Sequence, residues 1–206
     1  MRKSFLLFIS LLCAIAINAQ EATFDKRHQL IKNPSFEEEA NPIRNRRFGS
    51  NGEGELFGGR LPAGIIPGWI IPEEKDSATK IEISTDKLLE GQYKALRWKI
   101  TEVPSAIANV GNQGIEVFKG GKYVLTFWAR AEKRYKGKFR IGLQSKSGDG
   151  TWYAQTVIKG RITKRWKRFS VAFAAEGDAE NTRFVMTADK PGVLFLDVMS
   201  LSSSDL

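Results

Sequence analysis

Residues able to act as a nucleophile, an acid or a base are few in this chain of 206 residues, and none has the neighbours that catalysis needs. His28 is the only histidine, so a Ser–His–Asp triad would have to use it, and with Cys13 as the only cysteine the soft ligands are too few for a zinc site. Glycoside hydrolysis requires two facing carboxyl groups. The acids at 37–39, 73–74 and 149 show no pattern that distinguishes a proton donor from a nucleophile. The sequence therefore predicts a protein that is not an enzyme.

One carboxylate is notable for its surroundings. Asp197 interrupts the otherwise apolar run at residues 193–201. A carboxylate buried in such a strand requires a partner, because an unpaired charge is strongly destabilising away from water. The residues alone leave that partner open, since Asp197 could cap a turn or pair with a nearby lysine.

Residues 1–19 have the order of a secretory signal peptide, with a basic start, an apolar centre and the small residue Ala19 at the end. This segment is too short for a transmembrane helix, so no membrane span is expected. Cys13 lies inside it, and the remaining chain has no cysteine. Export without disulfides is typical of a bacterial periplasm or outer surface. We therefore expect a secreted or periplasmic protein of a bacterial cell envelope.

The formal net charge is +9, of which Arg2 and Lys3 contribute two positive charges. Lysine at strand edges and turns prevents aggregation between edges, whereas a basic surface attracts acidic polysaccharides or other anionic surfaces. Both interpretations remain open. Nucleic acid is not expected as a partner, because no motif that reads it is present. The clustered lysines are Lys133, Lys136 and Lys138, and then Lys159, Lys164 and Lys167.

Short alternating segments separated by turn residues predict the fold. In Ala95–Ile100, for example, apolar positions alternate with Arg97 and Lys99, which is the period of a half-buried strand. No helical period of any length is present, so we expect an all-β, antiparallel β-sandwich of the jelly-roll kind. The expected strand-like segments are 28–36, 69–71, 80–84, 95–100, 114–118, 122–131, 138–144, 152–158, 166–174, 182–187 and 193–201.

The expected organisation is a single domain. Residues 20–27 form a leader after the signal peptide at 1–19, residues 28–202 form the sandwich, and residues 203–206 form a tail. Within the domain, residues 41–66 are rich in Gly, Arg, Asn and Pro and predict a long loop.

Three stretches together resemble a known family. They are Asn-Pro-Ser-Phe-Glu at 33–37 with Pro-Gly-Trp at 67–69, Gly-Gly-Lys-Tyr-Val-Leu-Thr-Phe-Trp-Ala-Arg at 120–130, and Trp-Lys-Arg-Phe at 166–169 with the strand at 192–201. In this order they resemble jelly-roll carbohydrate-binding modules of the family 4, 9 and 22 type. They are most similar to the module that precedes the catalytic barrel of family 51 α-L-arabinofuranosidases. The resemblance spans about residues 28–201.

The resemblance implies a galactose-binding-like jelly roll with a structural calcium ion that ties the first strand to the last. It places the carboxylates of Glu37 and Asp197 at the ion, together with the main-chain carbonyls of Ser35 and Lys94. Carboxylate and carbonyl oxygens are the ligands that Ca²⁺ prefers.

Sugar binding in such modules uses aromatic faces, which match the apolar C–H face of a sugar ring. Trp152 and Tyr153 are the first candidates, because they follow a turn at 147–150, and Trp128 is the second. For Trp69, Trp98 and Trp166 we expect places in the core. The polar candidates are Arg97, Asn109 and Gln113.

The chain departs from the arabinofuranosidase module in two ways. Residues 111–115 carry no aromatic where that module usually has one, and no catalytic barrel follows residue 201. We therefore expect an exported, non-catalytic carbohydrate-binding module for a plant-type or other polysaccharide or oligosaccharide, with a glycoside hydrolase as a further partner. The alternatives are a structural or adhesion sandwich that contacts proteins, and a non-catalytic fragment of an arabinofuranosidase-like hydrolase.

Overall fold

The computed structural model of the protein describes residues 29–38, 66–72, 79–109, 114–145, 150–159 and 161–203. The expected signal peptide, the leader, His28, Gln113 and the last three residues lie outside this part of the chain. The described residues contain no helix, and so none of them belongs to a helix that could cross a membrane.

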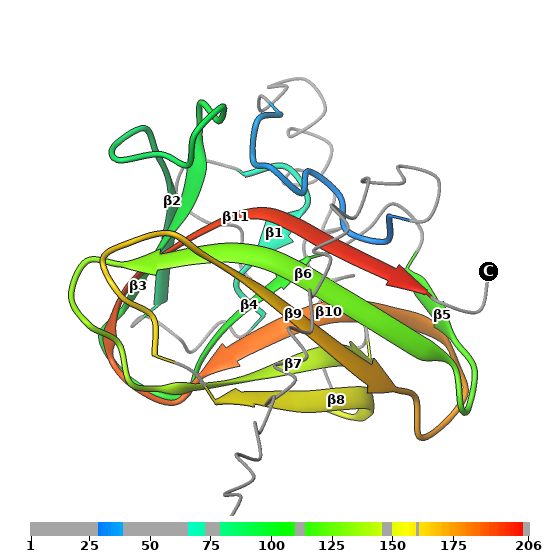
Figure 1. Ribbon diagram of the computed structural model, residues 1–206. Helices are drawn as coiled ribbons and strands as arrows, with labels where there is room; N and C mark the ends of the chain where they lie inside the picture. Colours follow the sequence, from blue (N-terminus) through cyan, green and yellow to red (C-terminus); the bar gives the residue numbers. More distant parts are fainter. Residues whose placement is uncertain are drawn as a thin grey trace, which may run out of the picture.

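Two antiparallel sheets form a sandwich, as predicted (Figure 1). The first sheet has the strand order β1-β4-β10-β7-β8, with β5 paired to β10, and the second has the order β2-β3-β11-β6-β9. The strands of the first sheet are β1 (Trp69–Ile70), β4 (Ser105–Asn109), β5 (Ile115–Val117), β7 (Lys138–Ser145), β8 (Trp152–Lys159) and β10 (Ala179–Ala188). Those of the second are β2 (Thr79–Ser84), β3 (Ala95–Ile100), β6 (Lys122–Ala131), β9 (Lys167–Ala174) and β11 (Gly192–Ser203).

The core lies between the sheets and follows from the alternation in the strands. Leu96, Trp98 and Ile100 of β3 are buried, as predicted, and the ring of Trp98 lies 6.4 Å from that of Phe139 of β7, centroid to centroid. Side chains of this size each contribute about 2 kcal/mol when they are removed from water. Trp69 is also buried, against Phe36 and Phe184.

Strand β4 was not expected from the sequence. Its inward positions include Ser105 and Asn109, while Ala106 and Ala108 point outward, so the usual contrast between apolar and polar faces is missing. The inward polar groups have partners instead. The hydroxyl of Ser105 bonds to that of Thr79 and accepts the indole N–H of Trp98 at 3.1 Å.

The segment at 28–36 was expected to be strand-like, but residues 29–38 form bends and turns. They run beside β11 (blue and red in Figure 1). The Leu30 N–H donates to the Leu201 carbonyl at 2.9 Å, and the Met199 N–H donates to the Pro34 carbonyl at 2.8 Å. Since β3 pairs with β11 only as far as Leu196, this segment satisfies backbone groups of β11 beyond the end of β3.

Candidate functional site

The outer face of the first sheet carries a hollow of about 400 Å³. It is formed by outward positions of β7, whose alternate residues Phe139, Ile141 and Leu143 are buried in the core. The lining residues are Pro104, Ala106, Lys138, Arg140, Gln144, Trp152, Val157, Thr187, Ala188 and Asp189. The same alternation that builds the core therefore places charged, amide and aromatic side chains together on the outside.

Small residues occupy the middle of this face. Val185 of β10 is paired with Ala108 on one side and with Gly142 on the other. A Cβ at Gly142 would lie 1.9 Å from the carbonyl oxygen of Ala154 in β8, so only glycine allows the two strands to approach this closely. Longer side chains from β7 and β8 rise beside these small residues.

Trp152 is the aromatic residue of the hollow. It is half-buried, packs against the cluster of Ile70, Ala108 and Val185, and has the Arg140 guanidinium 5.9 Å from its ring centroid. The amide of Gln144 accepts from Arg183 Nη2 at 3.4 Å and donates to the Gly150 carbonyl at 3.3 Å. A supported, partly exposed ring with an amide and a guanidinium nearby is an arrangement suited to a sugar ring and its hydroxyls.

Two of the other predicted sugar-binding residues have structural partners. Tyr153 lies at a β-bulge next to Trp152 but packs on the core instead of lining the hollow, and its carbonyl accepts the Glu176 N–H at 2.7 Å. Asn109 is fully buried. Its side chain accepts the Lys32 N–H at 3.0 Å and donates to the Lys32 carbonyl at 2.8 Å, so it anchors the N-terminal segment.

Trp128 and Arg97 belong to the second sheet. Trp128 is paired with Asp197 and Arg168 in neighbouring strands, and Arg97 forms an ion pair with Glu82. Gln113 lies outside the described residues. Of the five predicted residues that the structure describes, only Trp152 lies at the hollow. The structure adds Lys138, Arg140 and Gln144, which sequence reasoning missed although their alternation with Phe139 and Ile141 was visible.

A loop covers part of the outer face of the second sheet, around Arg130. Arg130 is 4% exposed, and its guanidinium lies 3.6 Å from the ring centroid of Phe195 and 5.4 Å from that of Trp166. Its Nε and Nη2 donate to the carbonyls of Lys87 and Asp86 at 3.0 and 2.9 Å. Burial lowers the pKa of Arg130 from its ordinary value. Trp166, which was expected in the core, is half-buried here and donates its indole N–H to the Lys87 carbonyl at 2.9 Å.

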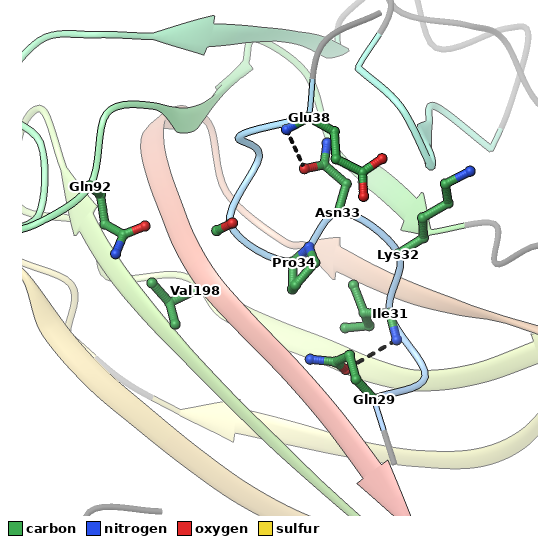
Figure 2. Close-up of a pocket in the computed structure, with 9 residues that line it drawn as sticks. Gln29, Ile31, Lys32, Asn33, Pro34, Glu38, Gln92 and Val198 are labelled. Atoms are coloured by element: carbon green, nitrogen blue, oxygen red, sulfur yellow. Dashed lines mark hydrogen bonds between the residues drawn. The ribbon is translucent and has the colours of Figure 1, made fainter. Parts of the chain in front are cut away.

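The four predicted calcium ligands gather where the N-terminal turn meets β3 and β11. Glu37 Oε1 accepts the N–H groups of Tyr93 and Lys94, each at 2.9 Å, and Lys94 Nζ donates to the Glu37 carbonyl at 3.2 Å. Ser35 lines a pocket of about 620 Å³ that Val198 of β11 also borders. Figure 2 shows this pocket between the turn, β11 and Gln92, with the Glu38 N–H bonded to Asn33 Oδ1 at 3.1 Å.

Asp197 is fully buried at this junction. Its Oδ1 accepts the Val198 N–H at 2.7 Å, whereas its Oδ2 has no hydrogen-bond partner among the described residues. Burial is the main cause that raises the pKa of Asp197 to about 7; the Val198 N–H opposes this rise, and the negative charge of Glu37 adds to it. A buried carboxylate oxygen without a partner, near a second carboxylate, matches the requirements of a hard cation.

The donor set at this junction is small. The described residues contain no group of three or more His, Cys, Asp and Glu side chains that could hold a metal. Two carboxylates would therefore need main-chain carbonyls and water to complete the shell, which Ca²⁺ accepts readily. The residues present fit calcium, and they do not fit zinc, which prefers nitrogen and sulfur ligands.

Comparison with known proteins identifies the family. The family described as "Carbohydrate binding domain" matches residues 28–192, which is most of the chain. A search of curated protein sequences found no match.

Solved structures share the fold. An arabinose-bound α-L-arabinofuranosidase of family GH51 superposes with a TM-score of 0.65 and 17% identity over 85% of this chain. This chain spans 26% of that enzyme. A putative sugar-binding protein from Bacteroides thetaiotaomicron superposes with a TM-score of 0.54 and 14% identity, over 85% of this chain and 100% of that one.

Proposed function

The chain belongs to the family of carbohydrate-binding domains, and on this basis we propose that it binds a polysaccharide at the hollow on the first sheet without catalysing a reaction. The observation that carries the proposal is the position of Trp152. Its ring is partly exposed beside the hollow and is supported from behind by Ile70, Ala108 and Val185. A ring held in this way loses little freedom when a sugar stacks on it.

Polar side chains around Trp152 can form hydrogen bonds with the hydroxyl groups of the sugar. Arg140 has donors for sugar oxygens, and the Gln144 amide can both donate and accept. The small residue Ala106 lines the hollow and leaves space above the sheet for a ring that stacks on Trp152. Stacking provides affinity for the C–H face, while the polar groups select the orientation of the hydroxyls.

The first ligands to test are arabinose- and xylose-containing glycans. The support is the shared fold with an arabinose-bound arabinofuranosidase, of which this chain spans about a quarter. We propose that the domain acts beside a glycoside hydrolase, which it would hold close to the glycan. Residues 1–19 have the sequence of an export signal, and a polysaccharide ligand suits a location at the cell envelope.

Calcium is proposed as a structural ion. Glu37 and Asp197 would supply carboxylates, and the carbonyls of Ser35 and Lys94 would complete the protein ligands. When bound, the ion would neutralise the carboxylate charge that is buried at Asp197. Glu37 also holds the start of β3 through the N–H groups of Tyr93 and Lys94, so the ion would fix the N-terminal turn to both β3 and β11.

Affinity-gel electrophoresis with soluble arabinan and xylan tests the proposed function. The wild-type protein is expected to be retarded by at least one glycan, and Trp152→Ala to lose the retardation. Trp128→Ala is the matched control, because it removes a half-buried tryptophan from the other sheet. No retardation of the wild type in a broad glycan panel would instead support a structural or adhesion sandwich. Equal losses in both variants would contradict the proposed site.

A further inference from the structure

Three connections between strands meet at one end of the sandwich, to the left in Figure 1. They are residues 132–137 between β6 and β7, residues 161–166 before β9, and residues 189–191 between β10 and β11. Tyr135 and Ile162 bond to each other in both directions, with N···O distances of 2.9 and 3.2 Å. The Ala131 N–H donates to the Thr163 carbonyl at 2.7 Å, and the Glu132 N–H to the Val193 carbonyl at 3.0 Å.

Tyr135 fixes this end from within. It is 4% exposed, its ring stacks on Phe139 with centroids 5.3 Å apart, and its hydroxyl donates to the Lys190 carbonyl at 3.1 Å. A Cβ at Gly137 or Gly192 would lie 2.2 or 2.9 Å from atoms of the Tyr135 side chain. The connections therefore pack tightly around the Tyr135 side chain, and this packing fixes the backbone from which their other side chains project.

These side chains are predominantly basic. The acids that the structure describes at this end are Glu132 and Asp189 on the three connections and Glu102 on the connection between β3 and β4. Asp189 Oδ1 accepts the Lys138 N–H at 2.6 Å. Among the described residues, no basic side chain on these three connections forms an ion pair. We call this surface the basic end. Its members, all exposed, are Lys133, Arg134, Lys136, Arg161, Lys164, Arg165 and Lys190 on the connections, with Lys138 at the start of β7.

The opposite end of the sandwich has the reverse balance. Its described turns and strand ends carry Glu116, Glu176, Asp178 and Glu180, with Lys119 and Lys122 as the basic residues. The positive charge of the protein is therefore not spread evenly, and an anion approaching it is directed to one end.

We propose that the basic end binds an acidic polysaccharide, a chain bearing carboxylate or sulfate groups. The choice of a sugar polymer as the anion rests on the proposed function. Lys138 belongs both to the basic end and to the hollow beside Trp152, so the two surfaces adjoin. Next to it, Lys133, Arg134, Lys136 and Lys190 border a shallow depression of about 470 Å³. A glycan that stacks on Trp152 can thus continue over a row of cations.

Each contact at the basic end is exposed, so it is weak alone and is screened by salt. Binding then depends on several contacts made by one polymer at once. The inference predicts affinity for a polyuronate that falls steeply with ionic strength, while binding of a neutral glycan at the hollow depends little on salt.

Affinity-gel electrophoresis with polygalacturonate, in low and high salt, tests the inference. The double variant Lys133→Glu with Lys190→Glu is expected to bind about tenfold or more weakly at low salt. The control Lys119→Glu with Lys122→Glu makes the same change in net charge at the opposite end, and is expected to change affinity less than about twofold. Equal losses in both variants would overturn the inference, because net charge alone would then explain the binding. Thermal unfolding of each variant checks that the fold is retained.

The same variants distinguish the polymer and the site. Binding of duplex DNA, or of vesicles of phosphatidylglycerol and phosphatidylcholine, as tight as that of polygalacturonate at equal ionic strength would overturn the assignment to a polysaccharide. Trp152→Ala with a neutral glycan tests the hollow separately. In one outcome, Trp152→Ala loses binding of the neutral glycan while Lys133→Glu with Lys190→Glu keeps its binding of polygalacturonate. That result would contradict the proposal for the basic end and would leave the proposed function supported.

Discussion

The outer faces of the two sheets carry similar residues in different states. Each has a tryptophan near an arginine: Trp152 with Arg140 on the first sheet, and Trp166 with Arg130 on the second. Arg140 is exposed above a hollow, whereas Arg130 is buried between Phe195 and the carbonyls of Asp86 and Lys87. Residue type does not separate a binding face from a structural one. The difference is made by what covers the face.

Two segments contact the second sheet, one over its outer face and one along its edge. The loop at Asp86 and Lys87 is held by Arg130 and Trp166, and the turn around Glu37 joins β11 beyond the end of β3. The first sheet has small residues and exposed polar side chains at the corresponding place, around Val185 and Gly142. A sugar can therefore meet the ring of Trp152 on this outer face.

The largest expected effect concerns the turn at Glu37. Calcium at a thousandfold excess over its Kd is expected to stabilise the protein by about 4 kcal/mol. Thermal unfolding in calcium and then in chelator measures this change. Asp197→Asn is expected to abolish the response, because it removes the buried charge and a ligand. Glu102→Gln, an exposed acid away from the turn, serves as the control and keeps the response. Equal melting temperatures with calcium and with chelator would contradict the calcium site.

The next effect compares the two arginines directly. Arg130→Ala is expected to lower the free energy of unfolding by about 2–3 kcal/mol, since it removes two hydrogen bonds from a buried charged group together with its ring contacts. Arg140→Ala is expected to change stability by less than about 0.5 kcal/mol, because its side chain is exposed. Urea unfolding measures both. A similar loss in the two variants would show that both faces are structural.

A third effect is a pH dependence in the metal-free protein, which follows from the buried carboxylate of Asp197. The folded protein keeps the Asp197 proton up to a pKa of about 7, whereas the ordinary value is 3.8. Between these values the folded state binds more protons, so stability falls as the pH rises and the loss is complete above about 7. Burial is the main cause, and the charge of Glu37 adds to it.

Urea unfolding at pH 5 and pH 8 in chelator measures that fall. Asp197→Asn is the control, because it cannot titrate and should lose this part of the pH dependence. Calcium is expected to reduce the fall in the wild type, since it stabilises the ionised carboxylate. A pH profile shared by the wild type and Asp197→Asn in chelator would rule out Asp197 as its source.

The alternation in the sequence was sufficient to predict the sandwich and most of its strands. It failed at β4, where Ser105 and Asn109 point inward and bond to Thr79 and Lys32, which are 26 and 77 residues away in the sequence. It also failed for residues 29–38, which form turns and make backbone hydrogen bonds to β11. In both cases long-range hydrogen bonds, which leave no periodic signal, determine the local structure.

The candidate site was less predictable than the fold. Sequence reasoning selected aromatic and polar residues by type, and these divide between the two sheets and the core. Alternation shows that Trp128 and Arg140 both point outward, but it does not show which outer face a loop will cover. Arg140 and Gln144 become candidates only once β7 and β8 are paired and Trp152 is placed across from Gln144.

The most direct test of the account is a titration of the isotope-labelled protein with an oligosaccharide from the glycan that it retains, followed by amide chemical shifts. The account predicts that the largest changes fall on β7, β8 and β10, around Arg140, Gly142, Trp152 and Val185, and that Trp152→Ala removes them. Changes confined to β6, β9 and β11, around Trp128 and Arg130, would contradict it and place the sugar on the second sheet.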